Sequence, residues 1–195
     1  MAAAIRRVLS LNVARASSVA INGRRVMTAI AKRPVDGPRA VLPLGIEGDE
    51  QADPSVHGGP SKAVYAYPSE HYDFWRTVRA QAGVSLWDDA LPFGALGENL
   101  TLAGVVESEL WIGDLLRFPH CVLAVSEPRT PCFKLDAALG FKHAGKLMVQ
   151  SGWCGAYLAV REPGTLSAGE AFTLSAGPRE VGIAELFRSR TARAG

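Results

Sequence analysis

The stretch of sequence that says most about the fold is HGGPSKAVYAYPSEHYDFW, residues 57–75. Its two glycines allow a tight turn, and the run AVYAY that follows is rich in residues that favour strands. The next residues predict a helix over 69–80, because they begin with a candidate N-cap serine and place Tyr72, Trp75 and Val78 three apart. We therefore expect a turn, a strand and a helix in that order.

Short apolar runs separated by glycine and proline recur along the rest of the chain, a pattern typical of strands in a barrel or a bent sheet. They lie at 8–13, 25–30, 40–46, 114–118, 121–125, 156–160 and 171–174. Further helices are predicted at 131–139, 142–150 and 181–190. The sequence thus predicts a mainly β fold with short helices, either a barrel or a bent sheet, with one domain over 1–180 and a short C-terminal helical tail over 181–195.

The composition is that of an ordinary globular protein, with 195 residues, 48% hydrophobic and 21% charged. A net charge of +2, from 21 Lys and Arg against 19 Asp and Glu, argues against nucleic-acid binding as the main activity. No run of 18 apolar residues indicates a membrane span. The three cysteines have no CxxC pair and no zinc-like spacing, so we expect a reduced, cytoplasmic protein. The sequence carries no signal for an oligomeric state.

The first 35 residues contain seven Arg or Lys and no acid, with alanines and serines between them. This composition is typical of a mitochondrial transit peptide. The segment 8–13, however, has the sequence VLSLNV, in which strand-forming residues partly alternate. It therefore also fits the first strand of the domain, which is the interpretation we favour.

A single cysteine is flanked by prolines and positive charge in SEPRTPCFKL, residues 126–135. We expect Thr130 to be the N-cap of the helix, Pro131 its first residue and Cys132 its second. The helix N-terminus would then favour a thiolate, with help from Arg129 and Lys134 if they point the same way. Such a sulfur serves as a nucleophile, a redox centre or a soft metal ligand. The alternative is a small apolar residue that fills a helix–strand junction.

Two glycine-containing segments add candidate binding residues. Backbone N–H groups at Gly58 and Gly59 can approach an anion, with Lys62 nearby, although such a turn also serves as a tight connection. In FGALGENLT, residues 93–101, Glu98 could hold a lysine or an arginine. Asn99 could bind a heterocycle or close an Asx-turn.

Four motifs taken in order resemble the MOSC domain, the module related to the C-terminal part of molybdenum cofactor sulfurases. They are HGGPSKAVYAYPSEHYDFW, FGALGENLT, WIGDLLRF and SEPRTPCFKL, and the resemblance extends over about residues 8–174, closest to the YiiM-like branch. It implies a strand-rich, barrel-like fold that binds the pterin-based molybdenum cofactor. It also implies reduction of N-hydroxylated compounds, such as hydroxylaminopurines, with electrons from a separate reductase. Pyridoxal phosphate binding is a further association at the level of the family.

The resemblance assigns Cys132 as the molybdenum ligand or sulfur-carrying residue. His57 or Glu98 are candidate proton donors. The residues expected to hold the anionic cofactor are Gly58, Gly59, Lys62, Asn99, Arg129 and Lys134. A carrier that holds sulfur on Cys132 as a persulfide, or hands on the cofactor without turnover, is the alternative function, and a barrel that has lost the cofactor is a third. From this resemblance we expect the small C-terminal helical module of many YiiM-like proteins to be at best a fragment in this sequence.

Overall fold

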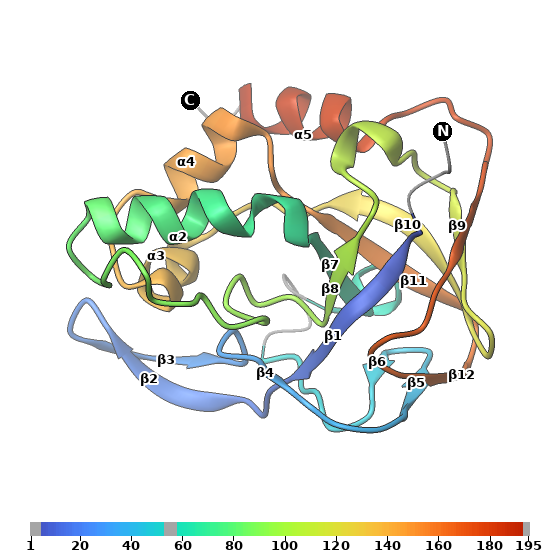
Figure 1. The fold of residues 1–195 in the computed structure, drawn as a ribbon, viewed down its shortest axis with the longest axis horizontal. Helices are drawn as coiled ribbons and strands as arrows, with labels where there is room; N and C mark the ends of the chain where they lie inside the picture. Colours follow the sequence, from blue (N-terminus) through green and yellow to red (C-terminus); the bar gives the residue numbers. More distant parts are fainter. Residues whose placement is uncertain (1–4, 53–57, 193–195) are drawn as a thin grey trace.

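An eight-stranded sheet forms the centre of the protein in the computed structural model, which describes residues 5–52 and 58–192 (Figure 1). Neighbouring strands are antiparallel except β7 and β8, which run parallel and are joined through a helix, as a parallel pair requires. In sheet order the strands are β13 (Thr173–Ser175), β9 (Leu115–Arg117), β10 (Val122–Pro128), β11 (Ala156–Glu162), β7 (Val64–Pro68), β8 (Leu100–Ala103), β1 (Arg7–Val13) and β4 (Arg33–Pro34).

Two smaller sheets complete the β structure. One is a hairpin of β2 (Ser17–Ile21) and β3 (Arg24–Thr28), and the other joins β12 (Gly164–Leu166), β5 (Arg39–Leu42) and β6 (Gly45–Ile46). The hairpin turns at Asn22 and Gly23, both of which have positive φ, the conformation that a two-residue hairpin loop requires.

The large sheet curls until its two ends meet. Val8 N donates to Glu170 O at 2.9 Å, Gly169 N donates to Val8 O at 2.7 Å, and a single β-bridge joins Arg7 to Ala171. Residues 169–172 lead directly into β13, at the opposite end of the sheet from β1 and β4. The predicted mainly β fold is therefore confirmed. Among the described residues, the barrel is brought together by this seam and is not closed by continuous strand pairing.

Short helices cover the sheet (Figure 1). Trp75 of α2 (Tyr72–Gln81) is fully buried. Ile183 and Phe187 of α5 (Ile183–Ala192) are fully buried where α5 packs against β10 and η3 (Glu107–Glu109). No helix in the described ranges is long and apolar enough to cross a membrane. The helical segments are η1 (Pro60–Lys62), η2 (Ser69–His71), α2 (Tyr72–Gln81), η3 (Glu107–Glu109), α3 (Phe133–Leu139), α4 (Ala144–Ser151) and α5 (Ile183–Ala192).

Most of the predicted elements are present. The expected strand is found as β7, and the helix expected over 69–80 is divided into the 3-10 turn η2 and the α-helix α2. Residues 8–13 lie in β1, as the strand interpretation requires. Four strands had no counterpart in the sequence analysis: β2, β4, β8 and β12. The division into a domain over 1–180 and a tail stays a prediction.

Candidate functional site

A pocket gathers residues that are far apart in the sequence. Its wall is formed by the end of β3 and the residues after it, by residues 49–52, by β7 and β11, and by the segment that joins β10 to α3. The space between its atoms is about 640 Å³, including the part open to solvent. Five residues predicted from the sequence line it: Lys62, Asn99, Arg129, Cys132 and Lys134.

Arg129 is the most unusual residue of the pocket. The residue is only 5% exposed, and its guanidinium lies 4.9 Å from the centre of the Tyr65 ring. The Nη1 atom is buried and has no hydrogen-bond partner among the described residues. A guanidinium stays protonated in proteins, and a buried donor without an acceptor costs about 1–3 kcal/mol. A hydrogen-bond acceptor on a ligand, above all an anionic one, would therefore bind favourably beside Arg129.

Cys132 lies beside Arg129, close enough for an electrostatic interaction between the two side chains. It is a free, half-buried cysteine. The predicted helix start is wrong, however: Cys132 is the N-cap, with φ −131° and ψ 170°, and α3 begins at Phe133. Because Cys132 has extended backbone angles, it cannot be the second residue of a helix that starts at Pro131. The first turn closes with Leu135 N donating to Cys132 O at 2.9 Å.

The two predicted lysines line the pocket with different partners. Lys62 Nζ lies 4.0 Å from a carboxylate oxygen of Glu127 and 5.8 Å from the centre of the Tyr157 ring. Lys134 Nζ donates to Met27 O at 3.1 Å, which ties α3 to the end of β3. Both lysines add positive charge to the pocket wall.

Asn99 is fully engaged within the protein. Its Oδ1 accepts from Tyr65 N at 3.0 Å, and its Nδ2 donates to Asn12 O at 3.2 Å and to Asp49 Oδ2 at 2.9 Å. These bonds connect β7, β1 and the 49–52 segment. Asn99 therefore positions the pocket wall, and its amide is already occupied by protein groups.

The predicted glycine turn lies next to the pocket. Gly59 has φ 88° and donates its N–H to Gln51 Oε1 at 3.0 Å, and Gln51 lines the pocket. Neither Gly58 nor Gly59 is among the residues that form its wall. His57 lies outside the described residues.

Glu98 is a fully buried carboxylate that is not part of the pocket wall. It accepts hydrogen bonds from Tyr72 Oη, from Thr101 Oγ1 at 2.7 Å, and from the backbone N–H groups of Gly94 at 2.8 Å and Leu96 at 3.1 Å. Burial raises its pKa, and these hydrogen bonds oppose the rise. Glu98 therefore holds the 94–98 loop against β8 and α2, which is not the position that a proton donor to a pocket ligand needs.

The sequence analysis missed an ion pair in the pocket wall. Lys32 and Asp49 are paired, with side chains only 8% and 7% exposed, and both line the pocket. Tyr65 and Tyr157 also line it and face each other across β7 and β11. The signal for Asp49 was the acidic run EGDE, residues 47–50, shortly before the glycine turn.

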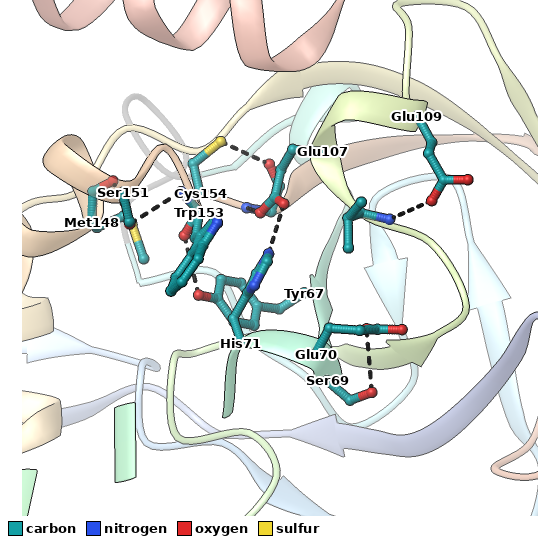
Figure 2. Close-up of polar contacts among 12 residues, drawn as sticks. Tyr67, Ser69, Glu70, His71, Glu107, Glu109, Met148, Ser151, Trp153 and Cys154 are labelled. Atoms are coloured by element: carbon teal, nitrogen blue, oxygen red, sulfur yellow. Dashed lines mark hydrogen bonds and ion pairs between the residues drawn. The ribbon is translucent and has the colours of Figure 1, made fainter. Parts of the chain in front are cut away.

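A second buried polar cluster supports the strand that carries Tyr157 (Figure 2). His71 Nε2 lies 2.8 Å from Glu107 Oε2, and Gly155 N donates to Glu107 Oε1 at 2.7 Å. The His71 ring stacks on Trp153, with 4.5 Å between centroids. Cys154 is fully buried beside them, and burial raises the pKa of its thiol. The cluster fixes the turn that leads into β11.

Comparison with known proteins identifies the family of the chain. The model of the MOSC domain matches residues 53–173, and the chain therefore belongs to the MOSC domain family. Within that family it is a YiiM-like protein, as the relatives below indicate.

Three relatives carry this assignment. YflK of Bacillus subtilis is 40% identical over 184 residues, which are 94% of this chain and 79% of YflK. YiiM of Escherichia coli is 38% identical over 159 residues, which are 81% of this chain and 68% of YiiM. The crystal structure of YiiM from Geobacillus stearothermophilus matches with a TM-score of 0.75 and 29% identity, covering 96% of this chain and 85% of that one.

A further relative, from Gibberella moniliformis, is named a reductase. It is 35% identical over 153 residues, which are 78% of this chain but only 26% of the reductase. The MOSC domain is of the type found at the C-terminus of molybdenum cofactor sulfurases, so membership of the family associates the chain with molybdenum-cofactor chemistry and is compatible with an oxidoreductase activity.

Proposed function

We propose that this protein binds the molybdenum cofactor in the pocket beside Arg129 and Cys132 and reduces N-hydroxylated compounds, such as hydroxylaminopurines, to their amines. The electrons come from a separate reductase. In this proposal Cys132 is the protein's ligand to molybdenum, and the anionic phosphate or dithiolene of the cofactor lies among Arg129, Lys62 and Lys134.

The observation that carries the proposal is the unsatisfied donor of Arg129. Its Nη1 is buried without an acceptor among the described residues, in the same pocket wall as the half-buried thiol of Cys132. An anion bound there would satisfy the guanidinium, and a thiolate is the kind of ligand that soft metals prefer. The residues of the pocket therefore fit an anionic group that carries a soft metal.

Each part of the pocket has a defined task in this function. The cofactor, when bound, supplies a metal centre that can pass two electrons to the substrate. Arg129 orients the anionic part of the cofactor, because a planar guanidinium binds oxyanions through two parallel hydrogen bonds. The rings of Tyr65 and Tyr157 line the wall and keep part of the site free of water.

Metal analysis of the protein tests the proposal directly. Protein made in a host that synthesises the cofactor is expected to contain molybdenum in near-stoichiometric amount, and the Cys132→Ala variant is expected to lose it. Cys121→Ala is the matched control, because Cys121 is a buried cysteine outside the pocket, and this variant should keep its molybdenum. The loaded protein should then reduce hydroxylaminopurines when a reductase supplies electrons.

Two results would contradict the proposal. Wild-type protein without molybdenum, but with an extra sulfur on Cys132 in the mass spectrum, would identify a sulfur carrier. Molybdenum that stays bound in Cys132→Ala would show that Cys132 is not the ligand.

A further inference from the structure

We propose that Lys32 is the proton donor of the reaction, giving a proton to the oxygen of the N-hydroxyl group as the N–O bond breaks, and that Asp49 positions it. This inference rests on the proposed function. It is an alternative to the proton donors expected from the sequence. Glu98 lies outside the pocket wall, and His57, which lies outside the described residues, stays a prediction.

The position of Lys32 is the first argument. It lies in the pocket wall together with Arg129 and Cys132, and its side chain is only 8% exposed. The other two lysines of the pocket differ in this respect: the Lys62 side chain is 25% exposed, and Lys134 is bound to the backbone of Met27. Lys32 is thus the pocket lysine that is buried and paired with a buried carboxylate, that of Asp49, in the pocket wall.

Asp49 is held firmly enough to orient Lys32. Its Oδ1 accepts from Ala14 N at 2.8 Å and its Oδ2 accepts from Asn99 Nδ2 at 2.9 Å, in addition to the bond from Lys32. The Lys32 backbone is fixed as well, because its N–H donates to Ile30 O at 2.8 Å. An ammonium group has three N–H donors, and Asp49 is the acceptor of its side chain in the described parts of the chain. Donors therefore remain for a ligand in the pocket.

The surroundings of Lys32 make its proton easier to release than that of an exposed lysine. Burial lowers the pKa of Lys32, and Arg129 adds to this, whereas Asp49 and Glu98 oppose it. A general acid works best when its pKa is near the pH of the reaction. Burial therefore brings Lys32 closer to this condition than the solvent-exposed lysines, and Asp49 offsets part of that effect.

The chemistry balances with one proton from Lys32. Reduction of R–NH–OH to R–NH₂ and H₂O consumes two electrons and two protons. The two electrons come from the separate reductase through the cofactor, and the N–O bond breaks. Lys32 protonates the departing hydroxyl, which leaves as water, and the second proton reaches nitrogen from solvent. Neutral Lys32 then takes up a proton from water before the next turnover.

Substitutions at Lys32 separate proton donation from cofactor binding. Lys32→Gln is expected to keep the molybdenum content of the wild type, because Arg129 and Cys132 remain, and to lose about 10²–10⁴-fold in kcat, the range for loss of a general acid. Lys32→Arg keeps the positive charge but releases a proton poorly, so its kcat should stay close to that of Lys32→Gln. Lys142→Gln, which removes the same charge from an exposed position, is the control and should behave as wild type.

The pH profile tests the role of Asp49. A proton donor must be protonated, so kcat falls as the pH rises through the pKa of Lys32. Asp49 raises that pKa. In Asp49→Asn we therefore expect the fall to begin at a lower pH than in the wild type, with molybdenum still bound. A purely structural role for Asp49 would lower the yield of folded protein without moving the profile.

The outcomes distinguish the two proposals. Two results would assign Lys32 to anion binding: full activity in Lys32→Arg, or a loss of molybdenum in Lys32→Gln that is restored, together with activity, in Lys32→Arg. Either result would overturn the inference and leave the proposed function intact. Wild-type protein that binds no molybdenum would overturn both. Melting temperatures of the variants close to that of the wild type would show that a loss of kcat does not come from unfolding.

Discussion

Replacing Glu107 with alanine is expected to destabilise the protein by several kilocalories per mole. Glu107 is 4% exposed and accepts from His71 Nε2 at 2.8 Å and from Gly155 N at 2.7 Å (Figure 2). The alanine leaves both groups buried without an acceptor, at about 1–3 kcal/mol each, or about 2–6 kcal/mol together.

Urea unfolding measures this loss. The free energy of unfolding of a domain is about 5–15 kcal/mol, so the transition of Glu107→Ala should shift to a clearly lower urea concentration with an unchanged m-value. Glu162→Ala removes an exposed carboxylate from the same strand that the cluster supports, and should stay within about 0.5 kcal/mol of wild type. A loss of less than about 1 kcal/mol in Glu107→Ala would refute the reasoning, since even one unsatisfied buried donor costs that much.

Three further predictions concern the thiols, Asn99 and one glycine. Burial raises the pKa of Cys121 to about 11 and also raises that of Cys154. Because the thiolate is the reactive form, iodoacetamide at pH 8 should label Cys132 alone in the folded protein and all three cysteines after unfolding. Rapid labelling of either buried thiol in the folded protein would contradict this. Asn99→Ala should lower the free energy of unfolding by about 1–3 kcal/mol, because Tyr65 N–H loses its acceptor, and unchanged urea transitions would contradict it. Gly94→Ala should lower the melting temperature more than Gly83→Ala. Both glycines have positive φ, but only a Cβ at Gly94 would come 2.7 Å from Lys32 O. Equal melting temperatures would contradict this, because they would show that the backbone at Gly94 moves away from Lys32 without cost.

Local signals explain which elements could be predicted from the sequence. The segment 63–80 has strand-forming residues followed by aromatic residues at helical spacing. These local preferences agree with the strand and the helix found in the structure. The β2–β3 hairpin was missed although Asn22-Gly23 is the strongest short signal for a hairpin turn. Strand β4 has only two residues, and no local pattern can indicate a pairing that short.

Site residues that are neighbours in one short motif could be predicted from the sequence, whereas residues that only the fold brings together could not. Cys132 and Arg129 stand in one short motif, so the sequence places them together. Lys32 and Asp49 are separated from that motif by about half of the chain, and they join it only because β1 and β7 bring their segments to the same end of the sheet. Glu98 has the residue type of a proton donor. It accepts four hydrogen bonds from groups in three segments of the chain, and only the folded structure shows them.

The seam between β1 and residues 169–172 has a consequence for synthesis on the ribosome. Three separate regions must pair with β1, which is near the start of the chain: β4, β8 and residues 169–172. Contacts between residues so distant in sequence make folding slow. The nascent chain therefore leaves Arg7 and Val8 of β1 without their final partners on one edge until residues 169–172 have been added. An exposed strand edge can pair with other chains. Chaperone binding to nascent chains should then be strongest just before residue 172 emerges.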